Sequence, residues 1–427
     1  MTERYDVLVV GAGPAGLAAA QAAASHGVRV GLLDAQARAG GQVWRHDVLA
    51  GVPRLARRSI AAALAPAGVE WLAQTRVLLA EAGDLLVEDP QRARRLEYAA
   101  LVLATGAREL LLPFPGWTLP GVTGAGGLQA LAKQDWPLAG KRVVVAGSGP
   151  LLFAAAATAR RHGARVLGIH EQAGREAVAR FAVGLWRWPG KLAQAMALRA
   201  QLLGTGYHCG SLVRRALGAE RVQAVEIEGQ HGVQRLDCDL VAVGYGLVPD
   251  LRLAHMLGCA SEAEGAHERI SVDGAQRTSI AGVYAAGEVC GIGGRDCARV
   301  EGAMAGHAAA GAQARAAQLQ GARRHARAFA AQLRRHFALR PEVRGLAEPD
   351  TVVCRCEDVP LCALDGYTDS RSAKLATRCG MGACQGRICG SVLAELGRFP
   401  RRGDRPPLFP ARLSSLSGEA AANPRDA

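Results

Sequence analysis

The chain has 427 residues, 49% of them hydrophobic and 21% charged, a balance that supports a buried core and excludes wholesale disorder. Its length suggests two or three domains. No apolar stretch reaches the roughly 18 residues that cross a bilayer, and the N-terminus lacks the basic segment and cleavage site of a secretory signal. We therefore expect a cytoplasmic globular protein without a membrane span.

The net charge of +13 comes from 51 basic and 38 acidic residues. Only four of the basic residues are lysines, and the arginines are scattered through an alanine- and glycine-rich chain. The densest stretch, Arg323 to Arg344, has the pattern of one basic helix face. This distribution argues against a nucleic-acid partner and leaves an acidic protein partner as the alternative.

The first elements along the chain predict a βαβ unit. Residues 5–10 are an apolar run typical of a buried parallel strand, 14–26 an alanine-rich helix and 28–33 a second strand. The turn into the helix is a G-x-G-x-x-G motif, whose residues are Gly11, Gly13, Pro14, Ala15 and Gly16. In such a motif the glycines allow a tight turn, close approach of a pyrophosphate and close helix–strand packing. The helix N-terminus then presents free N–H groups to the phosphates.

The predicted nucleotide site has further parts. Asp34 ends the second strand, where its carboxylate is placed to accept hydrogen bonds from a ribose diol. Three later segments resemble the flavin-contacting segments of flavoproteins that bind two dinucleotides, although Glu288 stands where aspartate is usual. These segments contain Gly41 and Gln42, Thr105 and Gly106, and Gly287 and Glu288. The nucleotide is therefore predicted to be FAD, with NAD or another adenine nucleotide as the alternative.

A second βαβ unit is predicted from strands at 142–146 and 165–169 and a helix at 151–162. Gly147 and Gly149 repeat the first two glycines of the motif, but Leu152 occupies the third position. Glu171 is placed to hold a ribose, and an acid at this point favours NAD over NADP. The leucine side chain should force helix and strand apart, which instead predicts a Rossmann fold that binds no NAD. The sequence leaves both interpretations open.

Further strands are expected at 100–104, 240–243 and 283–285, and residues 302–337 have a helical composition. An irregular stretch at 340–350 leads into a cysteine-rich segment. The tail from Phe399 is rich in proline and arginine, and we expect it to lie along the surface or to be disordered.

All eleven cysteines follow position 208, and six of them fall within 354–389. Cys362 is expected to be a packed thiol, which leaves five candidate ligands: Cys354, Cys356, Cys379, Cys384 and Cys389. In a long cytosolic chain such clustering indicates a metal site rather than a disulfide scaffold. Four thiolates suit zinc or an iron–sulfur cluster. The C-x-C pair and the glycine-rich later cysteines favour [2Fe–2S]. Spacing does not decide whether Cys379 or Cys389 is the fourth ligand beside Cys354, Cys356 and Cys384.

No constellation for amine chemistry is visible in the sequence, so no catalytic residue is assigned. The first 208 residues contain no cysteine. This argues against the chemistry of a glutathione-reductase-like enzyme, which needs a redox cysteine pair.

Together these segments resemble one family, the α subunits of flavin-dependent amine and amino-acid dehydrogenases, which includes opine oxidase, hydrogen cyanide synthase and D-hydroxyproline or proline dehydrogenase. The resemblance covers nearly the whole chain and is most specific at residues 115–133, 238–249, 291–306 and 354–390. The stretch between Cys356 and Cys379 is shorter than is usual for the family, which bears on the helices around the cluster.

The resemblance implies a division of labour. A glycine-oxidase-like β subunit flavoprotein would oxidise a secondary amine or amino acid such as hydroxyproline, proline or an opine. The α subunit would receive electrons, through an FMN held near the subunit boundary, and carry the [2Fe–2S] centre; a small third subunit can complete such assemblies. The alternatives are a self-sufficient NAD(P)H-dependent flavoprotein reductase and a non-catalytic iron–sulfur and nucleotide-binding scaffold.

The expected fold class is α/β, with two Rossmann-like dinucleotide-binding domains of the glutathione-reductase type, one inserted in the other, and a small helical Cys-rich [2Fe–2S] domain. The expected parts are the FAD-binding domain in two pieces, 1–110 and 241–340, the inserted NAD-like domain at 111–240, the [2Fe–2S] domain at 345–398 and a tail at 399–427.

Overall fold

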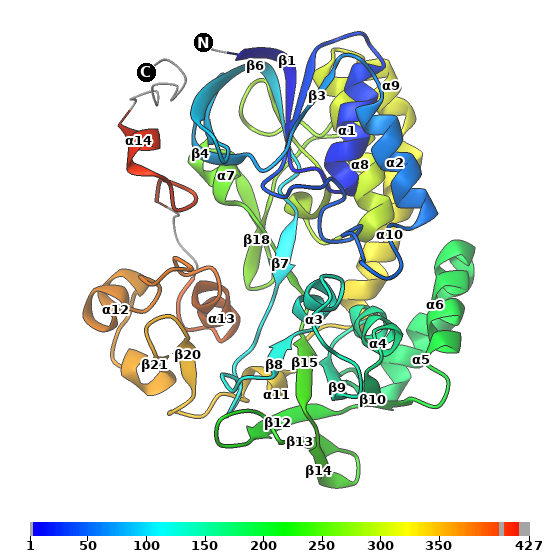
Figure 1. The fold of residues 1–427 in the computed structure, drawn as a ribbon, viewed down its shortest axis with the longest axis vertical. Helices are drawn as coiled ribbons and strands as arrows, with labels where there is room; N and C mark the ends of the chain where they lie inside the picture. Colours follow the sequence, from blue (N-terminus) through cyan, green and yellow to red (C-terminus); the bar gives the residue numbers. More distant parts are fainter. Residues whose placement is uncertain (1–2, 401–404, 418–427) are drawn as a thin grey trace.

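The computed structural model describes residues 3–400 and 405–417. Two α/β units lie one above the other along the long axis of the molecule, and a small cysteine-rich unit lies beside the second (Figure 1). None of the described helices combines the length and apolarity that a membrane span requires.

The first unit is built on a seven-stranded sheet in the order β3-β2-β1-β6-β5-β4, with β19 paired to β6. Its parallel part joins β1 to β2 and β6, β2 to β3, and β6 to β19, so the βαβ unit predicted at the start of the chain is present. The strands are β1 (Glu3–Val10), β2 (Val30–Leu33), β3 (Val69–Leu72), β4 (Arg76–Glu81), β5 (Asp84–Glu88), β6 (Ala93–Leu103) and β19 (Val283–Ala285). The helices α1 (Pro14–Ala24), α2 (Arg54–Leu64) and α8 (Gly294–Ala309) lie together on one side of this sheet (Figure 1).

The second unit is built on a five-stranded parallel sheet in the order β11-β10-β9-β15-β8. Its strands are β8 (Val122–Gly124), β9 (Arg142–Gly147), β10 (Arg165–Glu171), β11 (Gly206–Cys209) and β15 (Leu240–Gly244). Its helices are α3 (Ala125–Ala132), α4 (Leu151–Arg161), α5 (Arg175–Gly184) and α6 (Pro189–Gln201), with the short 3-10 helix η1 (Leu185–Arg187). A three-stranded antiparallel sheet of β12 (Leu212–Leu217), β13 (Ala224–Gly229) and β14 (Gly232–Asp237) extends from it.

The chain crosses between the two units on a pair of antiparallel strands, β7 (Ala107–Glu109) and β16 (Leu247–Pro249). The second unit is therefore inserted in the first. The sequence placed its end at residue 240, but β15 pairs with β8 and β9, so in the structure the inserted sheet extends to Gly244.

The helical stretch expected at 302–337 is divided in the structure. It comprises the end of α8, then α9 (Gln313–Gln318) and α10 (Gln320–His336), and α11 (Pro341–Arg344) follows. The remaining elements of the first unit are α7 (Arg252–Met256), the hairpin of β17 (Ser261–Glu264) and β18 (His267–Ile270), and η2 (Gly287–Cys290).

The cysteine-rich unit contains the two short strands β20 (Val352–Cys354) and β21 (Val359–Pro360), η3 (Leu361–Leu364), α12 (Ser370–Thr377) and α13 (Cys389–Glu395). The chain then returns to the first unit and ends, in its described part, with α14 (Leu413–Leu416) (Figure 1). The tail does not simply lie on the surface, because Leu408 is buried and its amide donates a hydrogen bond to the carbonyl of Leu78 on β4. Residues 401–404 and 418–427 of the predicted tail lie outside the described residues.

Candidate functional site

The glycine-rich turn after β1 is shaped so that only glycine fits at two of its positions. Gly11 has φ +103°, and a Cβ there would lie 2.3 Å from the carbonyl oxygen of Ala104. A Cβ on Gly16 would lie 1.7 Å from the carbonyl oxygen of Gly11. The turn therefore brings α1 against β1 and points the N-terminus of α1 out of the carboxyl end of the sheet, where a pyrophosphate binds in such folds.

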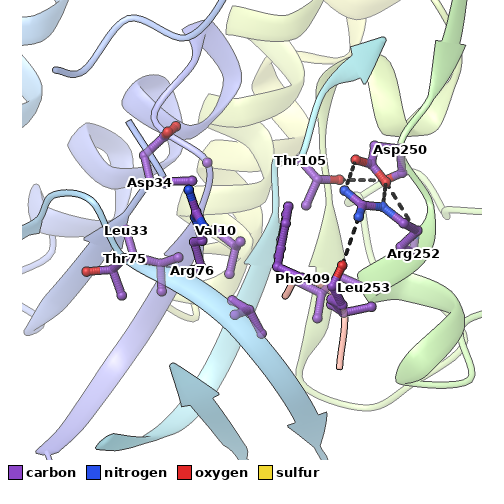
Figure 2. Close-up of a pocket in the computed structure, with 14 residues that line it drawn as sticks. Val10, Leu33, Asp34, Thr75, Arg76, Thr105, Asp250, Arg252, Leu253 and Phe409 are labelled. Carbon is purple, nitrogen blue, oxygen red and sulfur yellow. Dashed lines mark hydrogen bonds and ion pairs between the residues drawn. The ribbon is translucent and has the colours of Figure 1, made fainter. Parts of the chain in front are cut away.

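Asp34 lies at the carboxyl end of β2 and borders a cavity of about 140 Å³ (Figure 2). One carboxylate oxygen accepts the amide of Ala12 at 2.7 Å and the other accepts the amide of Gln36 at 2.8 Å. Burial raises the pKa of Asp34 above its usual value, against these amide contacts. Each oxygen keeps a lone pair, so the carboxylate is able to accept hydrogen bonds from a ribose diol, the role that the sequence predicted.

The cavity also has walls that the sequence did not reveal. Thr75, Arg76 and Val77 line one side. The other side is lined by Asp250, Arg252, Leu253, Leu408 and Phe409. Thr105 joins the two, because its hydroxyl donates to the carbonyl of Asp250 at 2.7 Å. The sequence did not assign these walls to one site, because they come from segments that lie far apart in the chain.

The segments predicted to contact a flavin converge on the same glycine turn. The amide of Gly40 donates to the carbonyl of Ala12 at 2.8 Å, and a Cβ on Gly41 would lie 2.8 Å from Cα of Gly13. On the opposite side, a Cβ on Gly287 would lie 2.9 Å from Cβ of Ala15. The neighbouring Gln42 is exposed, and its side chain accepts a hydrogen bond from Arg45.

Glu288 provides a direct test of whether the crevice suits a flavin nucleotide. Burial raises the pKa of its carboxyl to about 7. One oxygen accepts the amide of Gly294 at 2.9 Å, whereas Oε2 is buried and has no hydrogen-bond partner among the described residues. An orphaned buried acceptor is costly, and a hydroxyl of a ribityl chain is the kind of donor that would satisfy it. The longer side chain at this position is therefore compatible with a flavin nucleotide.

The second glycine turn has different surroundings, because residues 337–340 of the chain lie over it. The hydroxyl of Ser148 donates to the carbonyl of Phe337 at 2.9 Å, and a Cβ on Gly149 would lie 3.7 Å from the Phe337 ring. Gln172 donates to the carbonyl of Ala338 at 3.0 Å and accepts the amide of Arg340 at 3.1 Å. We call this segment, Phe337 to Arg340, the covering segment.

Glu171 is fully buried beneath this second turn. Its oxygens accept the amides of Gly149 at 2.7 Å and Ala173 at 2.9 Å, and burial raises the pKa of the carboxyl to about 7. Leu152 is also fully buried, in the core between α4 and the sheet, so the helix accommodates it. Gly147 keeps a positive φ of +136°, as the turn requires. Like Asp34, Glu171 accepts two amides, but unlike Asp34 it is fully buried, so a nucleotide could not reach it in this arrangement.

The five clustered cysteines come together in the small unit. The sulfur atoms of Cys354, Cys379 and Cys389 lie within 4.8 Å of one another, and the thiols of Cys356 and Cys384 hydrogen-bond to each other. A cavity of about 50 Å³ separates the thiols, and four of the five line it: Cys354, Cys356, Cys384 and Cys389. Cys379 does not line this cavity.

Backbone amides point at these sulfurs, as they do at sulfurs that carry negative charge. Burial raises the pKa of the Cys354 thiol although the amide of Gly380 donates to it. For Cys384, amides including that of Ile388 outweigh burial and hold the pKa below its usual value. A Cβ on Gly382 would lie 2.3 Å from Cβ of Cys356, so this glycine allows the loop to close over the site. The donor set fits a thiolate-ligated metal or iron–sulfur cluster.

The small unit contacts both larger units. Glu395 on α13 pairs with His267 on β18 at 3.0 Å and with Arg344 at 2.7 Å. The indole of Trp117 donates to the carbonyl of Val352 at 2.6 Å, and the guanidinium of Arg355 lies over its ring. The small unit that contains the thiol cavity is therefore attached to both larger units.

Residues 5–326 match the pyridine nucleotide-disulphide oxidoreductase family. The chain belongs to this family. It is 33% identical to an opine oxidase subunit of Rhizobium meliloti (strain 1021), over 97% of this chain and 98% of that protein. It is 32% identical to the hydrogen cyanide synthase subunit HcnB of Pseudomonas protegens, over 90% of this chain and 89% of that protein.

Among solved structures, L-proline dehydrogenase from P. horikoshii has the same fold, with a TM-score of 0.66 over 97% of this chain and 80% of that one, at 20% identity. These comparisons confirm the predicted family resemblance, the α/β fold class with Rossmann-type units, and a flavin oxidoreductase.

Proposed function

We propose that this chain is the electron-transfer subunit of a hetero-oligomeric, flavin-dependent dehydrogenase that oxidises a secondary amine or amino acid, such as hydroxyproline, proline or an opine. Two relatives that align over almost their full length are named as subunits, one of opine oxidase and one of hydrogen cyanide synthase. The substrate pocket would then belong to a partner, a glycine-oxidase-like flavoprotein, which agrees with the absence of an amine-binding constellation in this sequence.

The observation that carries the proposal is the thiol cavity in the small unit, which contacts both larger units. Its lining favours Cys389 over Cys379 as the fourth ligand, because Cys389 lines the cavity together with Cys354, Cys356 and Cys384. When bound, a flavin exchanges electrons in pairs or singly and a [2Fe–2S] centre exchanges them singly. The chain itself would hold the flavin nucleotide with Asp34 and the turn at Gly11, and would hold the cluster with the four thiolates.

The covering segment argues against the reductase alternative. An NADH molecule at the second turn would have to displace the carbonyls of Phe337 and Ala338 and the carboxylate of Glu171 from their partners.

The side chains of Val43, Val48 and Leu49 are exposed just after the flavin-side loop at Gly41. An exposed apolar group in this position suits a subunit boundary, where an FMN would be held.

The test is an anaerobic visible spectrum of the purified chain before and after NADH, with iron and sulfide analysis. We expect flavin and [2Fe–2S] bands that NADH leaves unchanged for minutes and dithionite bleaches. The Cys384→Ser and Cys389→Ser variants should lose the cluster, whereas Cys362→Ser is the matched control, since Cys362 is exposed in the same unit. The Cys379→Ser variant should keep the cluster.

Two results would contradict the proposal. Bleaching of the flavin by NADH within seconds would make the chain a reductase in its own right. A chain that binds neither flavin nor iron after anaerobic reconstitution would be a scaffold.

A further inference from the structure

The cavity beside Asp34 is the candidate site for the adenosine half of a dinucleotide. It is bordered by Asp34, the predicted ribose ligand, and by Thr75, Arg76 and Val77 at the start of β4. Gly41, Gly287 and Glu288, which belong to the flavin side of the crevice, do not line it. A planar base attached to a ribose at Asp34 would therefore enter this cavity.

One wall of this cavity comes from the far end of the chain, through Leu408 and Phe409. Figure 2 shows the Phe409 ring standing between the side that carries Asp34 and Arg76 and the side that carries Arg252. An aromatic ring in this position presents a π-face to whatever planar group occupies the cavity.

The backbone around Phe409 is fixed on both sides. The amide of Leu408 donates to the carbonyl of Leu78 at 3.0 Å, and its carbonyl accepts Nη1 of Arg252 at 3.1 Å. Beyond the ring, Arg412 pairs with Glu88 at 2.9 Å, and the hydroxyl of Ser415 donates to the same carboxylate at 2.6 Å. The segment is thus anchored to the first sheet before and after Phe409.

The ring itself is held by two guanidinium groups. That of Arg252 lies 4.7 Å from the ring centroid and is fixed by its ion pair with Asp250 at 2.6 Å. That of Arg387, from the loop between Cys384 and Cys389, lies 5.2 Å from the centroid. Such cation–π contacts favour one orientation of the ring. Phe409 is therefore preorganised and linked to the cysteine-rich unit.

We propose that the C-terminal segment is part of the nucleotide site, with Phe409 as the residue that stacks on the adenine and closes the cavity. This inference rests on the proposed function, because the nucleotide is taken to be FAD. It predicts that the segment around Phe409 contributes to nucleotide affinity, although in the sequence this segment is far from every glycine motif.

The experiment uses the full-length chain freed of nucleotide by dialysis against a chaotrope, and measures the dissociation constants of FAD and of AMP by calorimetry. Phe409→Ala and Phe409→Leu should weaken both ligands by roughly tenfold or more, since an aromatic–base stack has an affinity effect of this order. Phe409→Trp should restore binding. Leu413→Ala is the matched control, because Leu413 is 85% exposed in the same segment and touches no part of the cavity.

The outcomes separate this inference from the function on which it rests. If the wild-type chain binds no FAD, the proposed cofactor is wrong. If the wild type binds FAD and Phe409→Leu binds FAD and AMP equally well, the function stands and the role of Phe409 is overturned. Weaker binding of FAD with unchanged binding of AMP would also overturn it, because the ring would then act away from the adenine. Thermal melts of each variant show whether it is folded, and Phe409→Leu keeps the apolar bulk if Phe409→Ala does not fold.

Discussion

Two acidic side chains occupy corresponding places in the two nucleotide-binding folds, yet their surroundings differ. Asp34 accepts the amide of Ala12 and borders a cavity. Glu171 accepts the amide of Gly149, one position further along its glycine turn, and is fully buried. Glu171 also accepts the amide of Ala173, so both of its oxygens have partners within the second unit.

The buried carboxyl of Glu171 should make stability depend on pH. Its pKa rises from 4.5 to about 7 on folding, so the native state binds a proton more tightly, and wild-type stability should fall as pH rises from about 4.5 to 7. Because each pKa unit is worth about 1.4 kcal/mol, the Glu171→Gln variant should gain up to about 3 kcal/mol relative to wild type over this range.

Urea unfolding at pH 5, 6, 7 and 8 would measure this difference. Glu176→Gln is the control, because Glu176 is an exposed residue of the neighbouring helix α5. A difference between Glu171→Gln and wild type that does not change with pH would mean that this carboxyl is not buried as the structure has it.

For single residues, the sequence could predict only those that belong to a local motif. Gly11, Gly16 and Asp34 fall in one βαβ unit, so their spacing alone brings them together. Phe337 carries no motif, and the family-like segment around Phe409 did not indicate a cavity, because each residue reaches its turn or cavity through contacts with residues far away in the chain. Spacing likewise could not choose between Cys379 and Cys389, because that choice depends on how the thiols pack.

Among the elements, α1 and α8 make the closest helix pair of the nucleotide-binding unit. A Cβ on Gly302 would lie 2.0 Å from the carbonyl oxygen of Ala15, and one on Gly306 would lie 2.2 Å from that of Ala19. Glycine at these two turns of α8 therefore lets the backbones touch. Since the N-terminus of α1 is the proposed phosphate site and α8 begins just after Glu288, we expect their separation to affect flavin binding.

The Gly302→Ala variant should separate these helices, because backbone atoms of α1 cannot move aside as a flexible side chain would. We expect overpacking to cost about 1–3 kcal/mol and the variant to retain less flavin after gel filtration. Gly321→Ala is the matched control in α10, where an added Cβ meets nothing within 4 Å; there, alanine should be neutral or stabilising. Equal flavin content and melting temperature in both variants would contradict the close α1–α8 contact.

The elements also show what composition can and cannot predict. The strand at 283–285 has the bounds expected for it, since a short apolar run ended by glycine leaves little choice. The helical stretch at 302–337 is divided because Gly311 adopts φ +81° between α8 and α9. Gly311 is present in the sequence, but the alanines and arginines on both sides of it favour a helix, so composition alone did not predict the break.

Across the whole molecule, the cysteine-rich unit depends on a small number of contacts with its neighbours. Glu395 is almost fully buried where it pairs with His267 and Arg344, whereas Glu348 pairs with Arg215 on the surface. Both glutamates form ion pairs that connect this unit to the rest of the chain. They therefore allow a buried and an exposed ion pair at the same boundary to be compared.

We expect Glu395→Gln to lower the free energy of unfolding of this unit by about 1.5–3 kcal/mol, as for a buried hydrogen bond to a charged group, and to speed the loss of iron. Glu348→Gln removes an exposed ion pair and should lower the free energy of unfolding by only about 0–1 kcal/mol.

The effect of Glu395 should also depend on pH. The hydrogen bond from His267, ahead of burial and Arg344, sets the pKa of Glu395 below 4.5. The stabilisation is therefore complete above this pH and lost as pH falls through the folded-state pKa, so wild type and Glu395→Gln should converge in acid.

Thermal melts followed by cluster absorbance, from pH 3.5 to 7.5, would check this expectation. Flavin content at neutral pH should stay the same in both variants, because neither glutamate borders the nucleotide cavity. If Glu348→Gln and Glu395→Gln lost iron at the same rate, the buried pair would not be what positions the cysteine-rich unit against its neighbours. The contacts of Trp117 and Arg355 would have to hold the unit there instead.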